Sequence, residues 1–265
     1  MAIFSKFVKK KKEPVLGLAL GGGGARGYAH LGALKAFAEA GLTFPVVAGT
    51  SVGAIVGALY AAGANSDDLI HAGVAIDPKE IKTGPIFLAS PAKGIENLVR
   101  RFLGDMGFKE LKYKFACVAV DLIEAKQIIL TEGNIARAVS ASCAVPGVFQ
   151  PVVMNGCHLV DGGVLNTIPT DVARVLGADY VVAVDVNPTR GGGTASTSTV
   201  EVLQASLRIV TAQNAAYGRA NADVLVSAEL GDFSASKKNG FEQMMEIGYN
   251  AARKEIDNIK ALLAQ

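Results

Sequence analysis

Short apolar runs alternate with amphipathic segments along most of the chain. Apolar runs bounded by glycine, proline or polar turns predict strands, which we expect at 15–20, 44–48, 115–120, 127–131, 152–154, 158–160, 180–186 and 223–226. Apolar residues that recur every three or four positions predict helices, which we expect at 28–40, 52–62, 66–76, 135–142, 170–176, 202–220 and 241–263. The repeated strand–helix order is typical of a largely parallel sheet with helices on both faces.

Three stretches need a separate interpretation. Residues 79–107 give a mixed pattern, which indicates helix and loop, and residues 187–199 form a polar loop rich in Gly, Ser and Thr. Residues 46–63 are almost all small or apolar and approach the length of a membrane span. Pro45 and the glycines nearby instead favour a buried strand, a sharp turn and a buried helix. We therefore expect one domain over residues 14–265, preceded by a basic tail over residues 1–13.

Composition narrows the class of protein. Half of the residues are hydrophobic and the net charge is only +2, so a large core is expected and no global charge favours nucleic-acid binding. The tail holds five lysines, Lys6 and Lys9 to Lys12, beside Phe4 and Phe7. It has two readings: a disordered end, or a weak peripheral contact with anionic lipid. Three cysteines without metal-binding spacing, Cys117, Cys143 and Cys157, indicate reduced thiols in a cytoplasmic protein.

The first chemical motif is a G-x-S-x-G sequence between a predicted strand and a predicted helix. Gly49 and Gly53 flank Ser51 in this motif. A serine at such a turn is held in a strained conformation, and flanking glycines let the backbone fold tightly so that the hydroxyl is exposed. The following helix directs N–H groups toward a developing negative charge. Ser51 is therefore the candidate nucleophile.

A glycine cluster follows the first predicted strand. Its GxGxxG spacing raises a dinucleotide-binding alternative, but the acidic residue expected after the second strand is absent, and Ser51 stands there instead. We favour an oxyanion hole formed by backbone N–H groups of Gly22, Gly23 and Gly24. Gly27 completes the motif. Arg26 has two readings, because it either fixes the loop through a salt bridge or binds an anionic head group.

Asp161 is the candidate base. It stands at the end of a predicted strand, and Gly162 and Gly163 after it leave the backbone room to bring its carboxylate to the serine. A Ser–Asp–His order is poorly supported, since the chain's last histidine, His158, precedes Asp161. His158 is the second choice for the base.

Taken in order, these motifs resemble those of the patatin-like phospholipases, in particular the bacterial branch related to neuropathy target esterase. Residues 141–151 also look like the A-S-x-x-x-P-x-x-F-x-P segment of that family, and the resemblance covers about residues 15–190. It implies a single three-layer α/β domain with a largely parallel central sheet, of the FabD/lysophospholipase-like fold. It further implies ester hydrolysis on acyl lipids by a Ser51–Asp161 dyad, with no metal and no cofactor.

Two other functions remain open at this point. The same dyad would serve an acyltransferase, in which an alcohol or thiol replaces water as the acceptor. The chain could instead be a non-catalytic, nucleotide-binding regulatory protein, although the missing ribose-binding acid counts against it. The sequence indicates neither the acyl chain, the head group nor the oligomeric state.

Overall fold

Five parallel strands extend from the middle to one edge of an eight-stranded sheet. The computed structural model describes residues 13–76, 78–81, 89–187, 198–231, 233 and 240–264. The parallel strands lie in the order β3 (Lys114–Asp121), β2 (Val46–Thr50), β1 (Leu16–Leu20), β7 (Tyr180–Asp185) and β8 (Val224–Ser227). Antiparallel pairing adds β4 (Lys126–Leu130), β5 (Val152–Met154) and β6 (Cys157–Asp161) at the β3 end. All residues of β1 and β2 are buried, as expected for parallel strands that are covered on both faces.

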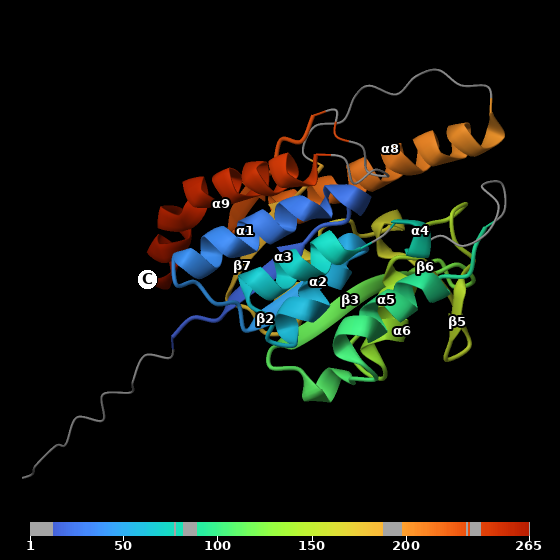
Figure 1. Ribbon diagram of the computed structural model, residues 1–265, viewed down its shortest axis with the longest axis horizontal. Helices are drawn as coiled ribbons and strands as arrows, with labels where there is room; N and C mark the ends of the chain where they lie inside the picture. The colour runs from blue at the N-terminus through green and yellow to red at the C-terminus, as the bar shows by residue number, and fades with distance from the viewer. Residues whose placement is uncertain are drawn as a thin grey trace, which may run out of the picture.

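Helices cover both faces of this sheet (Figure 1). Leu18 and Val184 belong to the apolar cluster with α1 (Tyr28–Glu39) and α9 (Phe241–Leu263), whereas Ala19 and Ala183 face the opposite layer. That opposite layer contains α7 (Thr170–Val175) and α8 (Thr199–Ala220). The first face also carries α2 (Val52–Ala61), α3 (Ser66–Ala75), α5 (Lys93–Leu103) and α6 (Ile135–Ser142), and α4 (Pro78–Ile81) contacts α5. The sheet is therefore the middle layer of three, as predicted.

The ends of β2 and β6 meet because both strands pair with the same edge of β3. β4 pairs with β3 from Cys117 to Asp121 and so occupies one edge there. β2 pairs with β3 up to Thr50, opposite Val118, and β6 ends at Asp161, opposite Ala119. Both pairings overlap the stretch that β4 covers, so both must use the other edge. Two strands running toward each other thus bring Ser51 and Asp161 to one place.

The C-terminal helix α9 lies side by side with α1 (Figure 1). Two glycines permit the close approach of the two backbones. A Cβ added at Gly32 would lie 1.8 Å from the carbonyl oxygen of Met245, and one added at Gly248 would lie 2.0 Å from that of Ala29. Neither space admits a side chain, so this helix pair depends on glycine at both positions.

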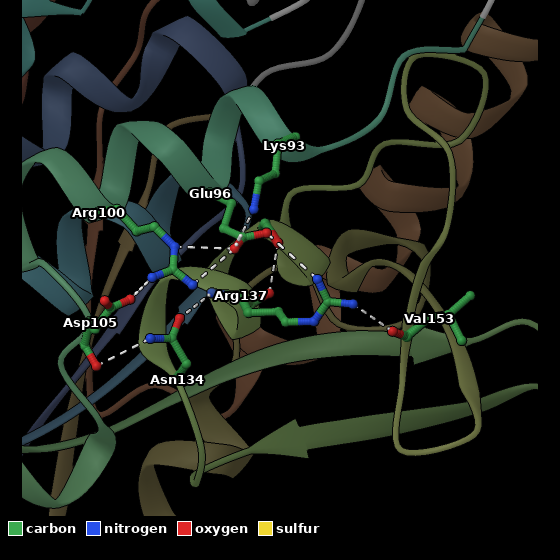
Figure 2. Close-up of polar contacts among 8 residues, drawn as sticks. Lys93, Glu96, Arg100, Asp105, Asn134, Arg137 and Val153 are labelled. Carbon is green, nitrogen blue, oxygen red and sulfur yellow. Dashed lines mark hydrogen bonds and ion pairs between the residues drawn. The ribbon is translucent and has the colours of Figure 1, made fainter.

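A buried carboxylate joins α5 to α6 (Figure 2). Glu96 is 4% exposed and accepts from Lys93 Nζ at 2.9 Å and Arg100 Nη2 at 3.1 Å, while Arg137 Nη1 lies 3.6 Å from its second oxygen. Burial opposes ionisation of Glu96, but the hydrogen bonds from Lys93 and Arg100 outweigh it and lower its pKa. Arg137 also donates to the Val153 carbonyl at 2.8 Å, so the cluster fixes the start of α6 against β5.

Most predicted elements are present, with differences at their ends. The strands predicted at 152–154 and 158–160 pair as a hairpin, and Asn155 and Gly156 between them have the positive φ that its turn requires. β2 begins and ends two residues later than predicted. α3 is capped by Asn65, whose side chain accepts from two amides. Residues 46–63 form β2 and α2. No helix among the described residues combines the length and hydropathy needed to cross a membrane. Residues 1–12 and 188–197 lie outside the described part.

Candidate active site

Ser51 occupies a strained turn between β2 and α2. Its φ of 55° and ψ of −124° are unusual for a residue with a side chain, and such strain is characteristic of functional turns. The neighbouring glycines are required by close contacts. A Cβ at Gly53 would lie 2.1 Å from the Leu20 carbonyl oxygen, and one at Gly49 would lie 2.4 Å from that of Gly53. The predicted strand–turn–helix setting of Ser51 is therefore confirmed.

The turn is fastened from the far end of α6. The backbone N–H of Ser51 donates to Ser142 Oγ at 3.0 Å. Cys143, the next residue, is buried near both Ser51 and Asp161, and its burial raises the pKa of its thiol, with Asp161 adding to that rise. A protonated thiol is neutral, so Cys143 contributes an uncharged wall beside the serine. The block at 141–151 thus contacts the candidate nucleophile directly.

The Asp161 carboxyl is buried beside Ser51. One oxygen, Oδ1, accepts from the Gly163 N–H at 2.8 Å, whereas Oδ2 is buried and has no hydrogen-bond partner among the described residues. Burial raises the pKa of Asp161 to about 6, and interactions with the Ser51 hydroxyl and the Gly163 amide partly oppose this rise. A Cβ at Gly162 would lie 2.3 Å from the Val118 carbonyl oxygen, so glycine is needed where β6 ends against β3. An unpaired carboxylate oxygen beside a serine is suited to accept its proton.

The three histidines lie elsewhere. No hydrogen bond within the described residues joins His30, His71 or His158 to Ser51. His158 is exposed on the hairpin, where its backbone N–H donates to Asp121. His30 is buried beneath the glycine loop, with Nε2 2.8 Å from the Gly21 carbonyl, and burial lowers its pKa to about 4. The arrangement favours Asp161 over His158 as the group that faces the serine.

The glycine loop differs from expectation at one position. The N–H of Gly22 donates to the Thr167 carbonyl at 3.0 Å, so it is not a free donor in this structure. Among the described residues, no backbone acceptor takes a hydrogen bond from the amides of Gly23 or Gly24. A Cβ at Gly23 would lie 2.4 Å from Val186 Cγ2. Gly22 therefore holds the loop in place, and Gly23 and Gly24 remain the predicted oxyanion donors.

Arg26 fixes this loop to the C-terminal third of the chain. Its guanidinium donates to Asn187 Oδ1 at 2.7 Å, to the Phe233 carbonyl at 2.8 Å and to the Gly231 carbonyl at 3.0 Å. All three acceptors are neutral groups of the described residues. Three such bonds match the loop-fixing role and leave little of the guanidinium for a head group. Gly27 supports the same turn, because a Cβ there would lie 2.2 Å from Val52 Cγ2.

Asn187 is a site residue that the sequence did not reveal. Its side chain is buried, donates to the Gly22 carbonyl at 2.7 Å and accepts from Arg26. Behind it, Arg219 Nε pairs with Asp185 Oδ2 at 2.6 Å and Arg219 Nη2 donates to the Asn187 carbonyl. Its position could have indicated this role. Asp185 and Asn187 stand at the carboxyl end of a parallel strand, where the functional sites of α/β sheets usually lie.

Comparisons with known proteins find similarity in both sequence and fold. A sequence model described as "Patatin-like phospholipase" matches residues 18–174, which include the glycine loop, Ser51 and Asp161. An uncharacterized NTE family protein of Mycobacterium tuberculosis is 35% identical over 190 residues, which make up 70% of this chain and 52% of that protein. Mouse patatin-like phospholipase domain-containing protein 7 is 34% identical over 193 residues, 69% of this chain and 14% of its own.

The chain thus spans about half the length of the mycobacterial relative and a smaller part of the mouse protein. Among solved structures, VipD from Legionella pneumophila superposes with a TM-score of 0.61 over 93% of this chain and 67% of VipD, at 16% identity. The type III effector ExoU superposes with a TM-score of 0.52 over 93% of this chain and 53% of its own, at 15% identity. These two structures show that the fold is shared.

Proposed function

The chain belongs to the patatin-like phospholipase family, and from that premise we propose that it hydrolyses carboxylic esters of acyl lipids, with Ser51 as nucleophile and Asp161 as base. The observation that carries the proposal is a strained, half-buried serine beside a buried carboxylate whose Oδ2 has no hydrogen-bond partner among the described residues. The family supports a lipid hydrolase, and the geometry supports this assignment of roles.

The first half of the reaction forms an acyl-enzyme. Ser51 Oγ attacks the ester carbonyl carbon while Asp161 takes the hydroxyl proton. The amides of Gly23 and Gly24 would donate to the carbonyl oxygen as it becomes negative, which stabilises the tetrahedral intermediate. The intermediate collapses as the alcohol leaves, and the proton held by Asp161 passes to that alcohol. Ser51 then carries the acyl group as an ester.

The second half returns the enzyme to its starting state. A water molecule gives a proton to Asp161 and attacks the acyl carbonyl, and the same amides stabilise the second intermediate. Collapse of this intermediate releases the fatty acid, and the proton passes from Asp161 back to Ser51 Oγ. Burial raises the pKa of Asp161 to about 6, which suits a group that must both accept and donate a proton. At neutral pH it is mostly ionised, yet it holds a proton more readily than an exposed aspartate.

A fluorophosphonate probe tests the nucleophile directly. We expect covalent labelling of the wild-type protein, loss of labelling in Ser51→Ala, and retention in Ser66→Ala, which changes a serine at the start of α3 instead. Intact mass after labelling should shift by one probe equivalent. Equal labelling of wild type and Ser51→Ala would refute the assignment.

A panel of phospholipids, lysophospholipids and neutral acyl esters, followed by mass spectrometry, tests the reaction. We expect free fatty acid from at least one member with wild type and none with Ser51→Ala. Acyl transfer to an added alcohol in place of fatty acid release would instead identify an acyltransferase with the same dyad. An acyl-lipid substrate lies at a lipid surface, and this supports the predicted contact of the basic tail with anionic lipid.

A further inference from the structure

Helix α8 carries most of its apolar side chains on the outside. Described side chains from Glu201 to Asn214 are exposed or half-buried, and the first buried one is that of Ala215. In Figure 1 the N-terminal half of this helix extends away from the helices that pack on the sheet. A helix with this composition would normally face the core, so its exposure needs an explanation.

The exposed apolar residues form one continuous face. It consists of Val202, Leu203, Ile209, Val210 and Tyr217, which are between 45% and 65% exposed. At about 100° per residue they share one side of the helix, while Arg208 lies on another side. The face extends about 22 Å along the axis at 1.5 Å per residue.

The remaining groups on this face carry no charge. Ser206 lies between Val202 and Ile209 and donates its hydroxyl to the Val202 carbonyl at 2.9 Å, within the helix. Gln213 continues the same side, and no Asp, Glu, Lys or Arg interrupts it. Charged groups orient one protein against another at an interface, and this face has none with which to do so.

The helix that carries this face packs beside the proposed active site. Thr211, directly after Ile209 and Val210, accepts at its carbonyl from Thr167 Oγ1 at 2.8 Å, and Asn214 donates to the Val164 carbonyl. Val164 ends the short 3-10 helix Gly162–Val164 that begins immediately after Asp161. The inner side of α8 therefore packs on the segment that carries the proposed base, and its outer side forms the apolar face.

We infer that this face of α8 lies against a lipid–water interface, with Leu203 and Ile209 among the acyl chains. The inference rests on the proposed function, because a site that takes acyl lipids from a bilayer must sit at its surface. An uncharged apolar stripe beside the site meets that need, since amphipathic helices bury such a face at the level of the head groups and upper acyl chains. Tyr217 at the end of the face is a residue type favoured at this boundary.

A single tryptophan tests the contact at one position, because the chain contains none. Ile209→Trp, prepared in the Ser51→Ala background, is mixed with phosphatidylcholine vesicles whose acyl chains are brominated. Val175→Trp is the matched control, since Val175 is 75% exposed but ends α7, which leads into the opposite end of the sheet through β7. We expect a blue shift and at least twofold quenching for Ile209→Trp, and neither for Val175→Trp.

Three outcomes would overturn the inference. They are no spectral change for Ile209→Trp, an equal change for both variants, and a change for Ile209→Trp that appears with protein concentration in the absence of vesicles. The last outcome would mean that a second copy of the chain covers the face.

A kinetic comparison separates this inference from the proposed function. We expect the double variant Leu203→Ser, Ile209→Ser to hydrolyse vesicle lipid about tenfold more slowly than wild type, while hydrolysis of a short soluble ester is unchanged and Val175→Ser matches wild type on both. Equal rates of the double variant and wild type on vesicles would overturn the inference alone. If wild type hydrolysed no ester, the proposed function would fail, and the fluorescence experiment would still decide the lipid contact.

Discussion

The backbone N–H of Ser51 donates to Ser142 Oγ across 3.0 Å, so the strained turn is held by the last residue of a helix that lies 91 positions away in the sequence. The strain at Ser51 can persist only if its surroundings fix it. α6, which carries Ser142, is in turn fixed at its start by the Glu96 cluster. The position of the nucleophile therefore depends on a chain of contacts that begins at α5.

Ser142→Ala removes this tether. A hydrogen bond of this kind contributes about 1 kcal/mol, so we expect about a fivefold loss in kcat/KM for a soluble ester. Ser140→Ala is the control on the same helix, because Ser140 is also buried but donates to the Arg137 carbonyl within its own helix. Similar losses in both variants would indicate a general effect on α6 rather than a role of the tether.

The pH dependence of ester hydrolysis should follow Asp161. Only the ionised carboxylate can accept the Ser51 proton, and burial raises its pKa to about 6. We expect kcat/KM for an uncharged soluble ester to rise as pH increases through about 6 and to level off above it. Asp161→Asn should abolish the reaction, and His158→Ala should keep both the rate and the profile. A shift of the pH profile in His158→Ala would indicate that His158, rather than Asp161, is the base.

The same raised pKa predicts a pH effect on stability. The folded state holds the Asp161 proton more tightly than the unfolded chain, whose pKa is near 3.8, so the stabilisation is present at low pH and is lost as pH rises through 6. A shift of about two units corresponds to about 3 kcal/mol. The fall in free energy of unfolding between pH 4 and pH 7 should accordingly be smaller in Asp161→Asn than in wild type, measured by urea denaturation.

Asn187→Ala tests whether the loop is positioned from the C-terminal third of the chain. It leaves the Gly22 carbonyl without its side-chain donor and removes one of the acceptors of Arg26. A small displacement of the oxyanion amides should lower kcat by about 10- to 100-fold with little change in KM. Asn187→Asp should behave alike, because it also lacks the donor to Gly22, whereas Asn221→Ala, outside this network, should match wild type. A rise in KM at constant kcat would contradict the positioning role.

Gly32→Ala should strongly destabilise the protein. The added methyl would overlap the Met245 backbone, which cannot move without shifting α9 against α1. We expect a loss of about 3 kcal/mol in the free energy of unfolding. At Gly57, on α2, the added methyl meets only side-chain atoms at 3.1 Å or more, so Gly57→Ala should change stability by about 1 kcal/mol or less. Equal values from urea titrations would show that the α1–α9 contact adapts easily.

The basic tail remains to be tested by vesicle sedimentation. We expect the full chain to bind anionic vesicles more than a chain that begins at Pro14, because the five lysines are attracted to the head groups. This electrostatic attraction is screened over about 8 Å at physiological ionic strength, so binding should weaken as salt is added. Equal sedimentation of both chains, or binding unaffected by salt, would assign the tail no role at the membrane.

Short sequence motifs predicted those parts of the candidate site that depend on residues close together in the sequence. The setting of Ser51 followed from its flanking glycines, and the placement of Asp161 followed from a strand end and the two glycines after it. The error at Gly22 has a different origin, because its N–H is taken by Thr167, far away in the sequence. Asn187 and Arg219 were missed for the same reason. The shift of β2 arose because a strand buried on both faces lacks the alternation that marks its ends.

The meeting of β2 and β6 on one edge of β3 also determines when, during synthesis, the site can come into existence. The chain is made from its N-terminus, so the nucleophile emerges long before the base. Asn187 and Arg219, which hold the glycine loop, appear later still, and α9 must then pack on α1. A partly synthesised chain therefore contains Ser51 but lacks Asp161 and the residues that hold the glycine loop. If the proposed function holds, a nascent chain cannot attack the lipids of the cell that makes it until residues through Arg219 have been synthesised.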